Sequence, residues 1–199
     1  MTSDIDSTAD QSPAGMGPQA ADRLAEYWVY GALPLAVLLV GLTPFVDGIA
    51  TSVFLALPAY MIHQFEEHDA DRFRAYVNAM LGSDRRGLGH GSVWVINVIF
   101  VWFLLLACFY AAGAAAGWGV IAAYLMAING AVHILATVRT RQYNPGLTTS
   151  VVLFFPLSFW ILVTQPATVT QHIGSAVLIL LLHAGILFWA IRARAGGPG

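Results

Sequence analysis

Long apolar runs alternate with short polar segments along most of the chain. Each run reaches the roughly 17 to 25 residues that a helix needs to cross a bilayer. We therefore predict an all-α, polytopic transmembrane helix bundle of about six spans, at about 28–46, 49–65, 92–112, 118–138, 148–164 and 174–191. Only Asp47 and Gly48 separate the first two runs, so one long buried hairpin is the main alternative to two full crossings.

Composition agrees with a membrane location. Hydrophobic residues make up 58% of the 199 positions and charged residues only 10%, whereas soluble domains carry about 25% charged residues. The formal net charge is -2 and the nine basic residues form no basic face, which disfavours nucleic-acid binding. The single cysteine, Cys108, rules out an internal disulfide, and we expect it to be a small packed hydrophobe.

The arginines set the predicted orientation. All nine fall in segments on one side of the six predicted spans, so the positive-inside rule places both termini in the cytoplasm. We predict a multi-pass protein of the cell membrane, an inner membrane in bacterial terms, with the lipid bilayer as its first partner. The expected domains are a disordered N-terminal tail over 1–26, a transmembrane helical domain over 27–194 and a loose C-terminal end over 195–199.

The segment 67–90 is the only sizeable polar piece between spans. Its apolar residues recur at helical spacing with arginine and aspartate between them; they are Phe73, Tyr76, Val77, Met80 and Leu81. We predict an amphipathic helix on the inner leaflet that ends at Gly82. A solvated connecting helix is an equal alternative.

Three metal-competent side chains, His63, Glu66 and Glu67, lie at the mouth of the second span. Successive helical residues turn by about 100°, so the two glutamates fall within about 60° of His63 and all three share one face. This spacing lets one helix supply several ligands to zinc, iron or manganese. His68 falls about 140° away from His63, and we expect it to face water.

Other spans carry polar residues at a similar depth. Asn129 and His133 are stacked four residues apart in the fourth span, and His183 and Asn97 lie at comparable depths in the sixth and third. Isolated histidines also join membrane helices by ordinary hydrogen bonds, which is the alternative for each of them. We predict a site with metal ligands His63, Glu66, Glu67, His133 and His183, and with supporting residues Asn97, Asn129 and Tyr143. Glu67 is either a ligand or the catalytic general base on a metal-bound water.

These residues carry a family resemblance. With His63-Gln64-Phe65-Glu66-Glu67, then Asn129 and His133, then Tyr143-Asn144-Pro145-Gly146, the chain resembles the HXXEE membrane-protein family from the second to the sixth span. The resemblance implies a membrane bundle in which His63, Glu66 and Glu67 are important. The family is largely uncharacterised, so the resemblance implies no substrate.

The leading functional hypothesis is a metal-dependent enzyme near the cytoplasmic leaflet, with one or two zinc, iron or manganese ions. Its substrate would be a lipid-like or membrane-dissolved small molecule, and hydrolysis and oxidation both fit. The first alternative is a small transporter or proton relay that uses the same His/Glu cluster. The second is a haem carrier with His63 and His133 as axial ligands. The sequence does not indicate an oligomeric state.

Overall fold

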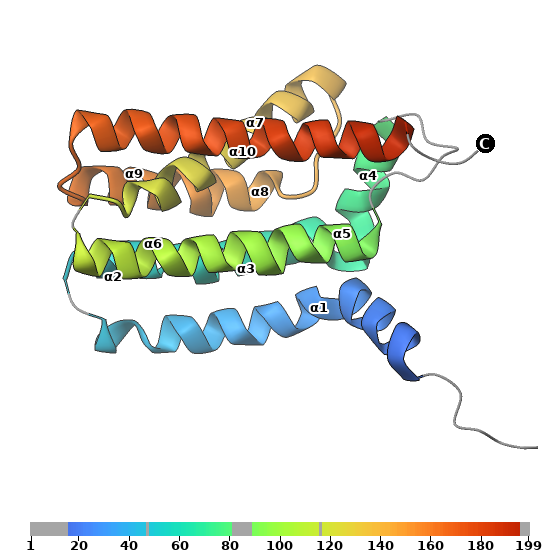
Figure 1. The fold of residues 1–199 in the computed structure, drawn as a ribbon, viewed down its shortest axis with the longest axis horizontal. Helices are drawn as coiled ribbons and strands as arrows, with labels where there is room; N and C mark the ends of the chain where they lie inside the picture. Colours follow the sequence, from blue (N-terminus) through green and yellow to red (C-terminus); the bar gives the residue numbers. More distant parts are fainter. Residues whose placement is uncertain (1–15, 47, 81–88, 116, 196–199) are drawn as a thin grey trace, which may run out of the picture.

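The computed structural model describes residues 16–46, 48–80, 89–115 and 117–195. Across these ranges the regular structure is helical, with no strand, and the long helices run side by side along one axis (Figure 1). Among the described residues, five helices are long and apolar enough to cross a membrane: Arg23–Gly41, His90–Ala114, Val120–Thr140, Leu147–Thr164 and Val169–Arg192. The predicted all-α bundle is therefore confirmed, and these helices, which have the length and composition of membrane spans, match five of the six predicted spans.

The first span is longer at its start than predicted. Helix α1 runs over Met16–Gly41 and is followed by a short 3-10 turn, η1, at Thr43–Phe45. Residues 16–26 of the predicted disordered tail are thus helical, because alanine, leucine, arginine and glutamate there are strong helix formers that extend the span. Residues 1–15 lie outside the described part of the chain.

The second predicted span corresponds to two short helices, α2 over Ala50–Phe54 and α3 over Ala56–His68. The Leu55 N–H donates to Thr51 O at 3.1 Å and the Ala59 N–H donates to Leu55 O at 3.1 Å, so hydrogen bonding continues across the junction. Pro58 has no N–H, and its ring removes one helical bond just after this point. The two helices together cover about 28 Å at about 1.5 Å per residue, and α1 packs against α3.

The remaining spans include two stretches of wider π-helix. The third span consists of α5 His90–Trp94, η3 Val95–Trp102 and α6 Phe103–Ala114. The fourth is α7 Val120–Thr140. The fifth consists of α8 Leu147–Thr149, η4 Ser150–Phe154 and α9 Phe155–Thr164, and the sixth is α10 Val169–Ala195. Both π-helical segments, η3 and η4, adjoin polar side chains described below, as π-helices often do.

The polar segment after α3 closes one end of the bundle (Figure 1). A 3-10 turn, η2 Asp69–Asp71, leads into α4 Arg72–Met80, which confirms a helix in the predicted amphipathic segment. Val77 on its apolar face packs against Val93 and Ala190. Leu81 and Gly82, the predicted end of this helix, lie outside the described residues.

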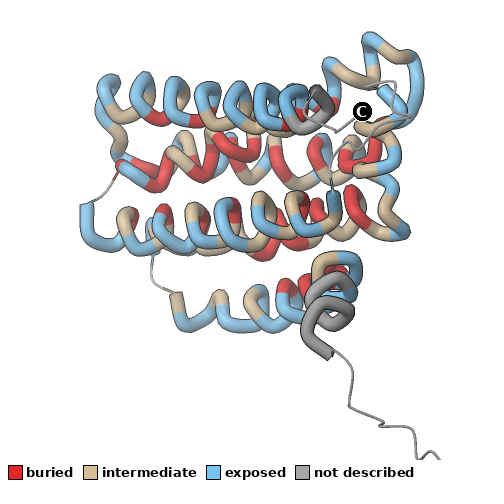
Figure 2. The backbone as a smooth tube through the Cα atoms, turned by 45° about the vertical axis from the view of Figure 1, so that its right-hand side comes forward, coloured by how far each residue is buried: buried red, intermediate tan, exposed pale blue. Residues whose placement is uncertain are grey.

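Buried positions form seams between the helices, whereas the outer faces are exposed (Figure 2). This distribution suits a bundle whose surroundings are lipid, since apolar side chains then cover the outside as well as the inside. Cys108 is buried in the main core cluster, together with Leu105 and Met126.

Candidate metal centre

Helices α3 and α7 bring two histidines and one glutamate together in the interior. His63 Nε2 lies 3.5 Å from Glu67 Oε2, and His133 Nε2 lies 3.0 Å from Glu67 Oε1. One ligand atom from each side chain lies within 4.8 Å of the others, and all three residues are buried. Metal–nitrogen and metal–oxygen bonds of about 2.0 to 2.2 Å in tetrahedral geometry place neighbouring ligand atoms about 3.3 Å apart. The observed spacing therefore fits one small cation.

Thr149 fixes the orientation and the protonation of His63. The Thr149 hydroxyl donates to Glu66 Oε2 at 2.5 Å, and the same oxygen lies 2.8 Å from His63 Nδ1. Because the hydroxyl has one hydrogen, His63 Nδ1 must be the donor in the second contact. The hydrogen-bond network thus assigns a proton to Nδ1, and in the neutral imidazole the lone pair is then on Nε2, the atom that faces Glu67.

The acceptor atoms of His63 and Glu67 therefore face each other. An imidazole lone pair and a carboxylate oxygen repel unless a cation or a proton lies between them, and a buried unpaired charge is costly. Asn129 also points toward this place, with its Nδ2 at 3.3 Å from His63 Nε2 and at 2.9 Å from the Tyr60 hydroxyl, to which it donates. His63, Glu67 and His133 therefore form a candidate ligand set, with Asn129 at its edge.

Glu66 has a different position from the one predicted. Its carboxylate accepts hydrogen bonds from the Thr148 N–H at 3.0 Å, from the Thr149 N–H at 2.7 Å, and from the Tyr143 hydroxyl. It caps the start of the fifth span, where free N–H groups and the helix dipole favour a negative charge. It lies outside the group of His63, Glu67 and His133 because the two glutamates flank His63 on opposite sides and face different helices.

Tyr143 lies in the connection between α7 and α8 and is 54% exposed. Partial burial raises the pKa of Tyr143, and the neighbouring Glu66 carboxylate raises it further. The phenol therefore stays protonated and remains a donor to Glu66.

His68 belongs to the cluster, so the expectation that it faces water was wrong. Its Nε2 lies 3.4 Å from Glu67 Oε2, and only 7% of the residue is exposed. Its ring packs between Trp28, at 5.5 Å between centroids, and Phe73, at 5.3 Å. The 140° estimate failed because α3 ends at this residue, whose φ of -105° and ψ of -6° depart from regular helix.

Two other predicted site residues have partners elsewhere. His183 Nδ1 lies 2.9 Å from Ile179 O on its own helix, and His183 is not part of the three-residue group. Asn97 donates to Val93 O at 2.9 Å and accepts from Gln64 Nε2 at 2.9 Å, while Trp102 donates to Gln64 Oε1 at 2.7 Å. Both residues have the predicted depth, but rotation about their helix axes directs them to other neighbours.

The turn after α7 forms the wall of the centre, a role that the sequence reasoning missed. Gly146 has a φ of +94°, in the left-handed region that favours glycine. A Cβ at this position would lie 2.7 Å from His133 Cε1, 2.8 Å from Glu67 Cγ and 2.8 Å from His63 Cε1. Glycine is thus needed both for the backbone conformation and for the close approach to all three side chains.

Comparison with known proteins gives one match. The model of a family described as "Protein of unknown function with HXXEE motif" matches residues 54–161, more than half of the chain. The matched range contains His63, Glu67, His133, Gly146 and Thr149. No curated protein and no solved structure matches the chain.

Proposed function

We propose that this chain, which belongs to the family of proteins with the HXXEE motif, is a membrane metalloenzyme with a divalent cation held by His63, Glu67 and His133. One observation carries the proposal: His63, Glu67 and His133 are buried together, with one ligand atom from each within 4.8 Å of the others. A divalent cation between them offsets the cost of burying these groups.

The donor set favours a single ion. Two histidines and one carboxylate are the ligands of mononuclear zinc hydrolases and also of non-haem iron oxygenases. Glu66 is occupied as a helix cap and His183 bonds to its own helix, so neither is available as a ligand for a second ion. Zinc and iron are the first candidates, followed by manganese.

The proposed substrate is a lipid-like or membrane-dissolved molecule, because α7, which carries His133, and the fifth span, which carries Thr149, have the length and composition of membrane spans. A bound cation with an open position would supply Lewis acidity for hydrolysis or a site for oxygen chemistry. Each oxygen of Glu67 faces an imidazole nitrogen, at 3.0 Å and 3.5 Å, which supports a ligand role over a free general base. Thr149 holds His63 in the binding orientation.

The haem alternative does not fit the cluster. The His63 and His133 rings are 5.0 Å apart between centroids, and the Gly146 backbone already lies against both of them. A macrocycle placed between two axial nitrogens would have to displace Glu67 and this turn.

A proton relay is the second candidate, and a specific chain of contacts favours it. Hydrogen bonds run from the exposed Tyr143 hydroxyl to Glu66, then to Thr149, and then to His63. Such a chain is able to carry protons between the surface and a buried histidine.

Elemental analysis of the purified protein tests the proposal. After reconstitution with Zn²⁺, Fe²⁺ or Mn²⁺, we expect about one ion per chain in the wild type, as for a three-residue site. His63→Ala, His133→Ala and Glu67→Gln should lose the ion, while the matched control His183→Ala should keep it. Wild-type protein that binds none of the three metals would refute the proposal. Metal-free protein that conducts protons in liposomes would favour the relay.

We also propose that the centre faces the cytoplasmic leaflet. It lies at the end of the bundle that carries Arg72, Arg74, Arg139 and Arg141, and arginine-rich ends are retained inside the cell. Single cysteines introduced near this end, in a Cys108→Ser background, should resist membrane-impermeant thiol reagents in intact cells. Labelling of these positions from outside would reverse the proposed orientation.

A further inference from the structure

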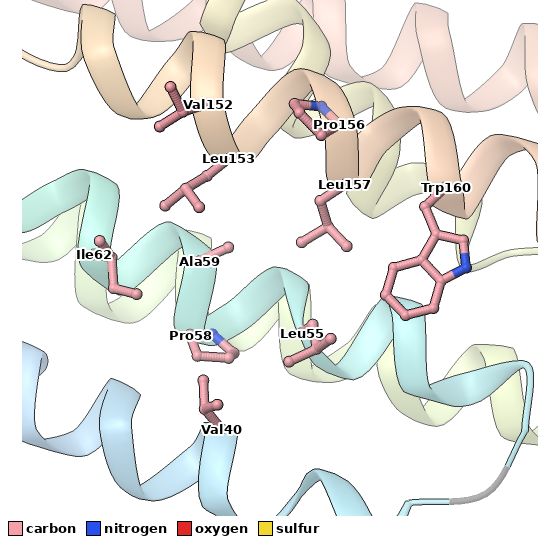
Figure 3. Close-up of a pocket in the computed structure, with 10 residues that line it drawn as sticks. All are labelled: Val40, Leu55, Pro58, Ala59, Ile62, Val152, Leu153, Pro156, Leu157 and Trp160. Atoms are coloured by element: carbon pink, nitrogen blue, oxygen red, sulfur yellow. The ribbon is translucent and has the colours of Figure 1, made fainter.

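A cleft runs along the seam between α3 and the fifth span, with the end of α1 on its other flank (Figure 3). Its volume is about 340 Å³ and its lining residues are all apolar. Leu153 and Leu157 of the fifth span point toward Ala59 on α3, whose small side chain does not fill the seam. Larger residues, Ile62 at one end and Trp160 at the other, bound it.

One end of the cleft lies next to the candidate metal centre. Ile62 is one helical turn before Glu66 on α3, and Leu153 is one turn after Thr149 on the fifth span. Glu66 and Thr149 are hydrogen-bonded to each other, about 6 Å beyond the cleft at one turn of helix. Thr149 in turn contacts His63, so a short polar path joins the apolar cleft to the ligand set.

The surroundings restrict what the cleft would bind. Bilayer lipid is as apolar as the walls of the cleft, so burial of apolar surface does not favour one ligand over another. The shape of the cleft and the polar residues at its end must therefore determine which molecule binds. A volume of about 340 Å³ is at the small end of ligand sites, which span about 300 to 1,000 Å³, and suits one hydrocarbon chain rather than two. The Glu66 carboxylate beyond the cleft disfavours an anionic head group.

We infer that the cleft binds the hydrocarbon chain of an uncharged long-chain amphiphile, such as an alcohol or an ester, with the polar end at Glu66 and Thr149. The inference rests on the proposed function, because it names the substrate class of that centre. The chain would enter from the bilayer beside Val152 and Trp160, both of which are exposed on the outer face.

Photolabelling of the full chain in nanodiscs tests the inference. The probe is a long-chain alcohol with a diazirine in mid-chain, and the matched probe is the fatty acid with the same chain. Mass spectrometry should find the alcohol concentrated on peptides that contain Ile62 and Leu153, reduced by unlabelled alcohol. Labelling of these peptides by the anionic fatty acid should be several-fold weaker.

Variants then test the place of binding. Ala59→Leu fills the cleft from its floor and should reduce labelling of these peptides several-fold, whereas Ala107→Leu, on an exposed face of α6, should not. Ile62→Phe fills the cleft from one end, and it is the second test variant if the Ala59→Leu protein does not fold. Even labelling of all lipid-exposed peptides, or labelling unchanged in a folded cleft variant, would overturn the inference. Equal labelling by the fatty acid and by the alcohol would refute the inference that the ligand is uncharged.

Metal analysis of the same samples separates this inference from the proposed function. A labelled cleft in protein that binds no metal would support the amphiphile site and refute the metalloenzyme. A metal-loaded protein without cleft labelling would support the metalloenzyme and refute the amphiphile site. Both cleft variants should keep the metal content of the wild type, because neither residue is a ligand.

Discussion

Replacement of Gly146 by alanine is the sharpest test of the centre, because one added methyl group meets all three candidate ligands. The new Cβ would lie 2.7 to 2.8 Å from carbon atoms of His63, Glu67 and His133. Non-bonded carbons prefer about 3.5 to 4.0 Å. The ligand side chains or the turn must therefore move by several tenths of an ångström.

Two costs combine in this variant. An alanine in a left-handed conformation such as φ +94° is less favourable by about 1 to 2 kcal/mol. Overpacking of a filled interior costs about 1 to 3 kcal/mol more. We expect Gly146→Ala to lower the free energy of unfolding by about 2 to 5 kcal/mol, and to weaken metal binding about 10- to 100-fold, as for other changes beside a ligand.

Unfolding of the protein in detergent, followed by tryptophan fluorescence, and a chelator competition for the bound metal would measure both effects. Gly185→Ala is the matched control, since a Cβ at this position in α10 has nothing within 4 Å. If Gly146→Ala unfolded like Gly185→Ala and bound metal like the wild type, the turn would not lie against the ligands and our account of the centre would fail.

Substitutions at three further positions separate metal binding from stability. Thr149→Val should weaken metal binding about 10- to 100-fold, because His63 loses the acceptor that orients it, and Thr149→Ser should restore it in the same chelator assay. Glu66→Gln should cost about 1 to 2 kcal/mol of stability as a lost helix cap, yet elemental analysis should find the metal retained; loss of the ion would make Glu66 a ligand. Gln64→Leu should cost about 1 to 3 kcal/mol by leaving the Trp102 N–H unpaired, with metal content unchanged; an unaltered unfolding curve would contradict that hydrogen bond.

Hydropathy was sufficient to predict the helices, because a bilayer requires long apolar segments whose backbone bonds are internal. The depth of each polar side chain from the end of its span was also predictable, since each residue advances a helix by about 1.5 Å. Counting from the polar ends placed His63 and His133 at one level, and their rings are indeed 5.0 Å apart.

The rotation of each helix about its axis, and therefore the neighbours of each side chain, were not predictable from the sequence. A helical wheel gives the angle between Glu66 and Glu67 but not which helix each one faces, and here one faces α8 and the other α7. His183 has a suitable depth but a different direction. The contact of Gly146 with the candidate ligands was not predicted, because a turn glycine has the same sequence signature whether it faces solvent or a packed site.

The candidate ligands come from the second and fourth spans, with the whole third span between them in the chain. A cation shared by α3 and α7 would act as a cross-link between two helices that are distant in the chain. At a free-ion concentration 100-fold above its dissociation constant, such a link adds about 2.7 kcal/mol to cohesion of the bundle. Chelation would then loosen the contact between these two helices before it unwinds either of them, so metal supply would govern how firmly they stay joined.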